Sequence, residues 1–161
     1  MTPRRYLSNP FPPPSQLYAV YLSPHNGPAL AEPLYILPPS RNPLVRLSVA
    51  RTLRAAALAE LRKHASSGSA AINADALYTQ AEDALAALDA LLDSHTWFFG
   101  AQAPGLFDAS VFAYTHLLLD AALGAGWVDT RLRDAVCARP RLVAHRQRIL
   151  DAYFSVPAGN A

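Results

Sequence analysis

The side chains best suited to chemistry in this 161-residue chain are five histidines and one cysteine. No two histidines have the spacing of a helical metal pair, so a zinc site would have to combine scattered ligands. We therefore expect no metal. His116 shares an apolar helix face with Phe112 and Leu119, and the sequence offers it no carboxylate or nucleophile as a partner. A packed core or boundary residue is its expected role. The five are His25, His64, His95, His116 and His145.

Cys137 lies between Arg133 and Arg139, and neighbouring cations can lower the pKa of a thiol. A free cysteine is more often a small buried residue, and we expect that role here. The sequence contains no G-x-S-x-G, no phosphate-binding glycine loop and no H-E-x-x-H. These patterns predict no catalytic residue and no cofactor.

Asp108 stands three residues after Gly105, where a helix begins in the predicted pattern. A carboxylate in the first turn accepts hydrogen bonds from free amides and complements the helix dipole. We expect Asp108 to anchor this helix start in the interior.

The C-terminal region carries a series of arginines that allows two interpretations. The first is a solvated helix face, and the second is a docking surface for an acidic partner or anionic lipid headgroups. The six are Arg131, Arg133, Arg139, Arg141, Arg146 and Arg148.

These residues surround one central block, Trp97 to Leu119. Three aromatic residues and a glycine open it, a Pro-Gly loop follows, and the remainder is apolar almost all round. A helix that is apolar on every face belongs inside a bundle. We expect this core helix and its aromatic turn to anchor the fold through Trp97, Phe98, Phe99, Gly100, Gly105, Asp108 and Phe112.

Four further helices are predicted around this block. Residues 44–64 and 73–92 show apolar stripes at three-or-four spacing, and Asn73 suits a helix cap. A short helix is expected from Asp129 to about Ala138, and Pro140 suits the first turn of a last helix that ends near Phe154. The predicted fold class is therefore all-α, a bundle of about five helices over residues 44–154, with a frayed end at 155–161.

Eleven of the fourteen prolines lie at or before Pro43. Residues 1–43 are therefore expected to form an extended arm that is not helical over any length. The apolar runs 17–22 and 34–37 are expected to dock on the bundle as strands or straps. A disordered linker is the alternative.

The net charge of +2 is too small to indicate nucleic-acid binding. A single cysteine excludes an internal disulfide and suits a reducing compartment. No apolar run reaches the length of about 18 residues that a spanning helix needs. The N-terminus lacks the apolar run of a secretory signal. A soluble or peripheral protein is expected.

The block WFFGAQAPGLFDASVFAYTHLLL and the tail PRLVAHRQRILDAYF resemble the C-terminal domain of the metaxin family, a branch of the glutathione-transferase C-terminal superfamily. The segment NPLVRLSVARTLRAAALAELRK is similar to fungal metaxin-type subunits. The resemblance covers roughly residues 43–154. In transferase-like domains the core helix typically begins with Ser or Thr at the cap and has Asp three residues on. Asp108 matches the second feature, whereas Gly105 replaces the hydroxyl residue.

This resemblance implies a subunit without catalysis. Metaxin-like proteins belong to the sorting and assembly machinery of the mitochondrial outer membrane, which inserts β-barrel precursors. The implied partners are a barrel-forming membrane subunit, a second metaxin-like subunit and the precursors themselves. The implied location is peripheral, on the cytosolic face of the outer membrane.

Two other protein classes remain open. One is a true glutathione transferase, whose N-terminal thioredoxin-like half would supply the activating residue. The 43 residues before the first predicted helix are too short and too rich in proline for that half. The other is a transferase-like docking domain of a translation factor or tRNA synthetase.

Overall fold

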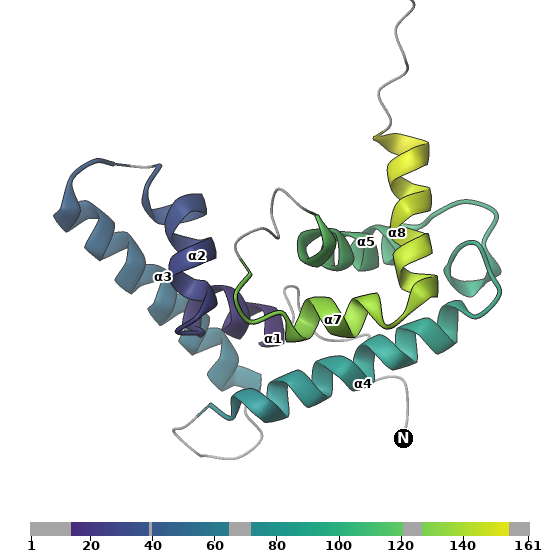
Figure 1. The fold of residues 1–161 in the computed structure, drawn as a ribbon, viewed down its shortest axis with the longest axis horizontal. Coiled ribbons are helices and arrows are strands. Elements are labelled where there is room, and N and C mark those ends of the chain that lie inside the picture. The colour runs from purple at the N-terminus through teal and green to yellow at the C-terminus, as the bar shows by residue number, and fades with distance from the viewer. Residues whose placement is uncertain (1–13, 39, 65–71, 121–126, 155–161) are drawn as a thin grey trace, which may run out of the picture. The chain divides into compact units, whose positions relative to one another are not determined.

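The computed structural model describes residues 14–38, 40–64, 72–120 and 127–154, and every regular element in these ranges is helical (Figure 1). The all-α prediction is confirmed, and the five helices expected after residue 43 are α3, α4, α5, α7 and α8. In chain order the elements are α1 (Pro14–Leu17), the π-helical η2 (Tyr18–Leu22), α2 (Asn26–Ala31), the π-helical η3 (Glu32–Ile36), α3 (Pro43–His64), α4 (Ala74–Leu92), the 3₁₀ turn η4 (Phe98–Gly100), α5 (Leu106–Leu119), α7 (Arg131–Cys137) and α8 (Pro140–Tyr153).

The chain divides into two compact units. Unit 1 takes its described residues from Met1–Ala81 and Gly126–Thr130, and unit 2 takes them from Glu82–Ala125 and Arg131–Ala161. Helix α4 therefore contributes residues to both units. The expected frayed end at 155–161 lies outside the described residues.

The prediction that residues 1–43 form no helix is wrong for residues 14–36, which hold α1, η2, α2 and η3. The prolines in this segment stand where a helix tolerates them. Pro14 begins α1, Pro28 lies in the first turn of α2, and Pro33 lies in the first turn of η3. The N–H groups of a first helical turn have no partner within the helix, so proline removes nothing there.

Part of this segment packs into the core of unit 1. Leu22 forms a buried cluster with Ala57 and Leu61 of α3, and Leu77 of α4 packs against it. Docking of the 17–22 run is therefore observed, but through helical turns. The 34–37 run is not buried in the same way, because Tyr35 is 45% exposed and Leu37 is 38% exposed.

Unit 2 is built from the second half of α4 together with η4, α5, α7 and α8. Its core contains Leu92, Phe98, Val111 and Leu142. Helix α5 contacts α7 and α8. Within the described ranges, no helix combines the length and apolarity needed to cross a membrane.

The expectation that α5 is buried on every face is wrong. The buried positions follow one stripe with three-or-four spacing, whereas Leu106 is 89% exposed and Ala113 is also exposed. The reason is that α7, α8 and the turn before α5 pack along that stripe and leave the other faces open. The stripe consists of Asp108, Val111, Thr115 and Leu118.

Candidate functional site

Asp108 is the polar centre of unit 2. It is the third residue of α5, and its side chain is 3% exposed. Its Oδ1 accepts a hydrogen bond from the backbone N–H of Phe98 at 3.0 Å, and its Oδ2 accepts one from the N–H of Gly105 at 2.9 Å. One carboxylate therefore joins the aromatic turn, the loop before α5 and the first turn of the helix.

His145 of α8 completes this centre, and the sequence did not identify it as a partner of Asp108. Its Nε2 lies 2.9 Å from Oδ1 of Asp108, and its side chain is fully buried. The rings of Trp97 and Phe98 meet it edge-on, with centroids 5.8 Å and 5.2 Å away. This Asp108–His145 pair thus connects the first turn of α5 and the second turn of α8 with the turn between α4 and α5.

A signal for His145 was nevertheless present in α8. His145 follows Leu142 by three residues and precedes Ile149 by four, and all three are buried. This spacing places the histidine on the buried stripe of the helix. The spacing indicates that His145 is buried, but it does not identify Asp108 as the carboxylate that contacts its ring.

Burial disfavours the charged form of both Asp108 and His145, and their hydrogen bonds oppose this effect. Burial would raise the pKa of Asp108, but hydrogen bonds from Gly105, Phe98 and His145 hold it below its usual value. Burial lowers the pKa of His145, opposed by Asp108 and reinforced by the Arg148 cation. The pair is therefore a carboxylate and a neutral imidazole. Since Nε2 donates, the unpartnered Nδ1 carries no proton.

The turn before α5 has an unusual backbone. Phe99 has φ 62° and Gly100 has φ 66°, both in the left-handed region that favours glycine. Left-handed backbone is a true outlier for a residue as bulky as phenylalanine. Phe98 is buried, whereas Phe99 is 64% exposed, with its ring 5.1 Å from that of Phe107. Within this predicted anchor turn, the side chain of Phe98 therefore points into the core and that of Phe99 points toward solvent.

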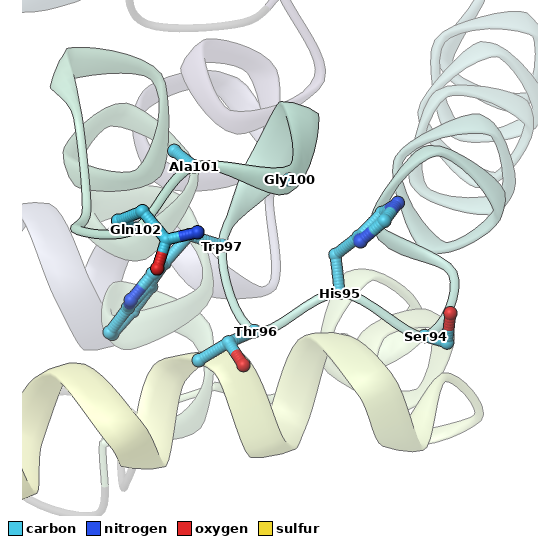
Figure 2. Close-up of a pocket in the computed structure, with 7 residues that line it drawn as sticks. All are labelled: Ser94, His95, Thr96, Trp97, Gly100, Ala101 and Gln102. Carbon is cyan, nitrogen blue, oxygen red and sulfur yellow. The ribbon is translucent and has the colours of Figure 1, made fainter.

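A hollow of about 290 Å³ lies beside this turn (Figure 2). Trp97 and Gln102 lie on one side of the loop, and the ring of His95 projects on the other. The lining offers hydroxyl, amide and imidazole groups but no carboxylate or thiol, so it presents hydrogen-bonding groups without an acid–base pair. The lining residues are Ser94, His95, Thr96, Trp97, Gly100, Ala101 and Gln102.

Phe112, expected to anchor the core, instead stacks at the other end of unit 2. Its ring is 5.0 Å from that of His116 and 5.6 Å from that of Phe154, nearly parallel to both. Phe112 and His116 are half-buried, and Phe154 is exposed. His116 therefore lies at the boundary of the core, one of the two roles expected for it.

The arginine series does not form one surface, because four of the six side chains are engaged inside unit 2. Arg139 donates to the backbone oxygens of Ala135 and Glu82, the second at 2.8 Å. Arg141 lies 3.2 Å from a carboxylate oxygen of Asp89. Both contacts tie the α7–α8 region to α4.

Two more arginines of α8 reach other segments. Arg146 donates through Nε to Nδ1 of His116 at 3.3 Å, and its Nη2 lies 3.9 Å from Asp120. Arg148 donates to the backbone oxygen of Thr96 at 2.9 Å. Arg131 and Arg133 of α7 are exposed, and a docking surface on α7 stays a prediction.

Cys137 corrects another expectation, since it is exposed and not buried. It is the last residue of α7, and the buried positions of this helix are Leu132, Ala135 and Val136. The thiol therefore lies outside the packed face. Among the described residues, no three His, Cys, Asp or Glu side chains are grouped so that they could hold a metal ion.

Comparison with known proteins places this region in context. A family model described as the glutathione S-transferase C-terminal domain matches residues 81–149. Metaxin-1 of Macaca fascicularis is 40% identical over 78 residues, which are 48% of this chain and 23% of that protein. Metaxin-1 of Homo sapiens is 40% identical over 78 residues, 16% of its length. Metaxin-1 of Mus musculus is 38% identical over 78 residues, 23% of its length. The aligned stretch thus spans less than a quarter of each relative.

Proposed function

We propose that this chain is a non-catalytic subunit of the β-barrel sorting and assembly machinery of the mitochondrial outer membrane. The proposal rests on the match of residues 81–149 to the glutathione S-transferase C-terminal domain model and on the similarity of 78 residues to metaxin-1. The chain serves in that machinery as a protein-interaction platform. Its partners are the barrel-forming membrane subunit, a second metaxin-like subunit and β-barrel precursors. It lies peripherally on the cytosolic face.

The proposal that the subunit is non-catalytic rests on the contacts of Asp108 and His145. Asp108 accepts three hydrogen bonds from within unit 2, and the histidine that faces it is fully buried. A general acid or base must reach its substrate. This pair has no exposed ring nitrogen, and its geometry supports a role in holding the turn and two helices together.

An enzyme is the second candidate, because the matching family model is that of a transferase domain. The hollow beside Trp97 supplies polar groups that a small ligand could contact. In the transferase reading this hollow belongs to a substrate site whose activating residue lies elsewhere. The two candidates predict different binding behaviour.

The test is affinity purification of the tagged chain from gently solubilised mitochondria of its native cells. The proposal expects the barrel-assembly subunits to co-purify in stoichiometric amounts. A Gln102→Ala variant serves as the matched control, because it changes the lining of the hollow and leaves α3 and the contacts of the arginines unchanged. A protein that is recovered alone and is retained by immobilised glutathione, with retention lost in this variant, contradicts the proposal and favours the transferase.

A further inference from the structure

The first turns of α3 carry apolar side chains that unit 1 does not cover. Leu44 is 74% exposed, Leu47 is 48% exposed and Val45 is 41% exposed. The buried residues of the same helix, Ala57 and Leu61, lie in its second half. The second half of α3 packs into the core of unit 1. This packing does not explain why the first half carries exposed apolar side chains.

Neighbouring residues of η3 extend this exposed surface. Tyr35 and Leu37 are partly exposed, and η3 contacts α3. The loop between them is held against the helix, because Arg46 Nε donates to the backbone oxygen of Ser40 at 2.6 Å. We name the surface formed by Tyr35, Leu37, Leu44, Val45 and Leu47 the α3 tip.

Arginines predominate along the sequence around the α3 tip. Between Glu32, at the start of η3, and Glu60 the sequence contains four arginines and no acidic residue. No ion pair joins any of the four to a carboxylate among the described residues, and three are exposed, although Arg46 and Arg54 donate to the backbone oxygens of Ser40 and Tyr21. Leu44, Leu47 and Arg51 lie on one face of α3, because they are separated by three and four residues. The four are Arg41, Arg46, Arg51 and Arg54.

From this combination we infer that the α3 tip is a docking surface for anionic lipid headgroups, with its leucines inserted into the boundary between headgroups and acyl chains. Basic side chains next to exposed aliphatic residues on one helix are the pattern of interfacial binding. Long arginine side chains keep their guanidinium groups at the headgroups while the aliphatic neighbours lie deeper. The charge excess selects anionic over neutral lipid.

An acidic protein partner would also suit the arginines, but the shape favours a bilayer. The exposed aliphatic side chains lie on the first turns of α3 and just after η3, whereas recognition of a partner helix needs a groove to receive it. The inference also moves the lipid contact from α7–α8, where four arginines are engaged, to α3. It deepens the proposed function, since it names the surface that would hold the chain on its membrane.

The test is flotation of the purified full chain with vesicles of phosphatidylcholine alone and of phosphatidylcholine mixed with phosphatidylserine. The inference expects binding to the mixed vesicles, little binding to the neutral ones, and weakening with added salt. Arg41→Gln, Arg51→Gln should weaken the partition constant about fivefold for each arginine. Leu44→Ser, Leu47→Ser should weaken it at least about tenfold, because two exposed leucines no longer insert.

The matched control is Arg131→Gln, Arg133→Gln, which removes the same charge from exposed positions of α7 and should bind as the unmodified chain does. Circular dichroism checks that each variant keeps its helix content. As a second measurement, the fluorescence of a Leu44→Trp variant in which Trp97 and Trp127 are replaced by Phe should be quenched by brominated lipid. This readout locates the tip directly.

Several outcomes overturn the inference. They are no flotation at any composition, equal loss in the α7 control, or unchanged binding of the leucine variant. Loss of a dimer in the leucine variant, measured by light scattering, would assign the tip to a second copy. Loss of co-purifying subunits without any vesicle binding would assign it to a protein partner. Because the assay uses the isolated chain, its failure is distinguishable from failure of the co-purification test.

Discussion

Asp108 receives hydrogen bonds from three segments, namely the turn at Phe98, the loop at Gly105 and α8 at His145, which is 37 residues away. Asp108→Ala leaves three donors without an acceptor. Each buried unsatisfied group costs about 1–3 kcal/mol, so the free energy of unfolding should fall by about 3 kcal/mol or more. Urea denaturation measures this change.

The control for that substitution is Asp151→Ala. Asp151 is exposed in the last turn of α8, where it accepts from Gln147 at 2.7 Å. A surface contact of this kind contributes within about 0.5 kcal/mol. Equal losses in both variants would mean that Asp108 is not the anchor of unit 2.

His145 should make stability depend on pH above the range where carboxylates titrate. Burial lowers its folded-state pKa, whereas the unfolded ring titrates near about 6.5. Between those two values the unfolded chain binds more protons, so stability falls as the pH is lowered through this window. The pKa of Asp108 is also lowered, so its contribution is lost only below about pH 4, as the pH falls through the folded value.

The measurement is urea denaturation of the unmodified chain and of His145→Asn from about pH 7 to about pH 5. The variant should be less stable at neutral pH, but it should lose less on acidification, since its side chain does not titrate. The other histidines are common to both proteins and cancel in the comparison. Parallel curves would show that His145 is not held neutral by the fold.

At the scale of elements, Asn26 secures the short connection before α7. Its Oδ1 accepts from the backbone N–H groups of Val128 and Asp129, both at 2.8 Å, and its Nδ2 donates to the oxygen of Asp129 at 3.2 Å. Asn26 is fully buried. Within unit 1, the N-terminal helical segment thereby holds a strip of chain that lies about a hundred positions later.

Asn26→Ala should lower the free energy of unfolding by about 2–3 kcal/mol, because two backbone donors lose their acceptor. Hydrogen exchange should quicken at the amides of Val128 and Asp129. Asn42→Ala is the matched control, since Asn42 is exposed and only caps α3 through the N–H of Leu44. The free energy of unfolding of Asn42→Ala should fall by about 1 kcal/mol, and hydrogen exchange at the amides of Val128 and Asp129 should not become faster. Unchanged exchange in Asn26→Ala would contradict the role of this side chain.

The same elements show what sequence pattern can establish. Helix α4 was located within about one residue, because its start signal and its apolar stripe are local. The Oδ1 of Asn73 accepts from the N–H of Ala76 at 3.0 Å, as a capping residue should. The number of prolines before residue 43 predicts no helix there. That prediction is wrong for residues 14–36, because Pro14, Pro28 and Pro33 stand in first turns, where a helix tolerates proline.

Contacts between distant positions were beyond the reach of pattern. The partner of His145 is 37 residues away, and the backbone oxygen that receives Arg148 is 52 residues away. Periodicity can place a residue on a face, but it cannot pair that face with a particular neighbour. For this reason the sequence predicts a single arginine surface. In the structure, Arg139, Arg141, Arg146 and Arg148 instead contact separate segments of unit 2.

At the scale of the whole molecule, the chain is continuous across its two units in a way that favours cooperative unfolding. Helix α4 runs through the division at residues 81–82, and the chain returns to unit 1 at residues 126–130 before it enters α7. Unfolding of either unit therefore removes packing from one half of a shared helix. A single small domain usually unfolds in one transition, and we expect the shared helix to make the two units behave as one such domain.

The two tryptophans allow this to be tested, because Trp127 belongs to unit 1 and Trp97 to unit 2. Trp97→Phe leaves a reporter of unit 1, and Trp127→Phe leaves a reporter of unit 2. Their fluorescence transitions in urea should each match the loss of helix seen by circular dichroism in the same variant. Adding Asn26→Ala to each should lower both midpoints together. If only the Trp127 signal moves, the units unfold independently, and α4 does not couple them.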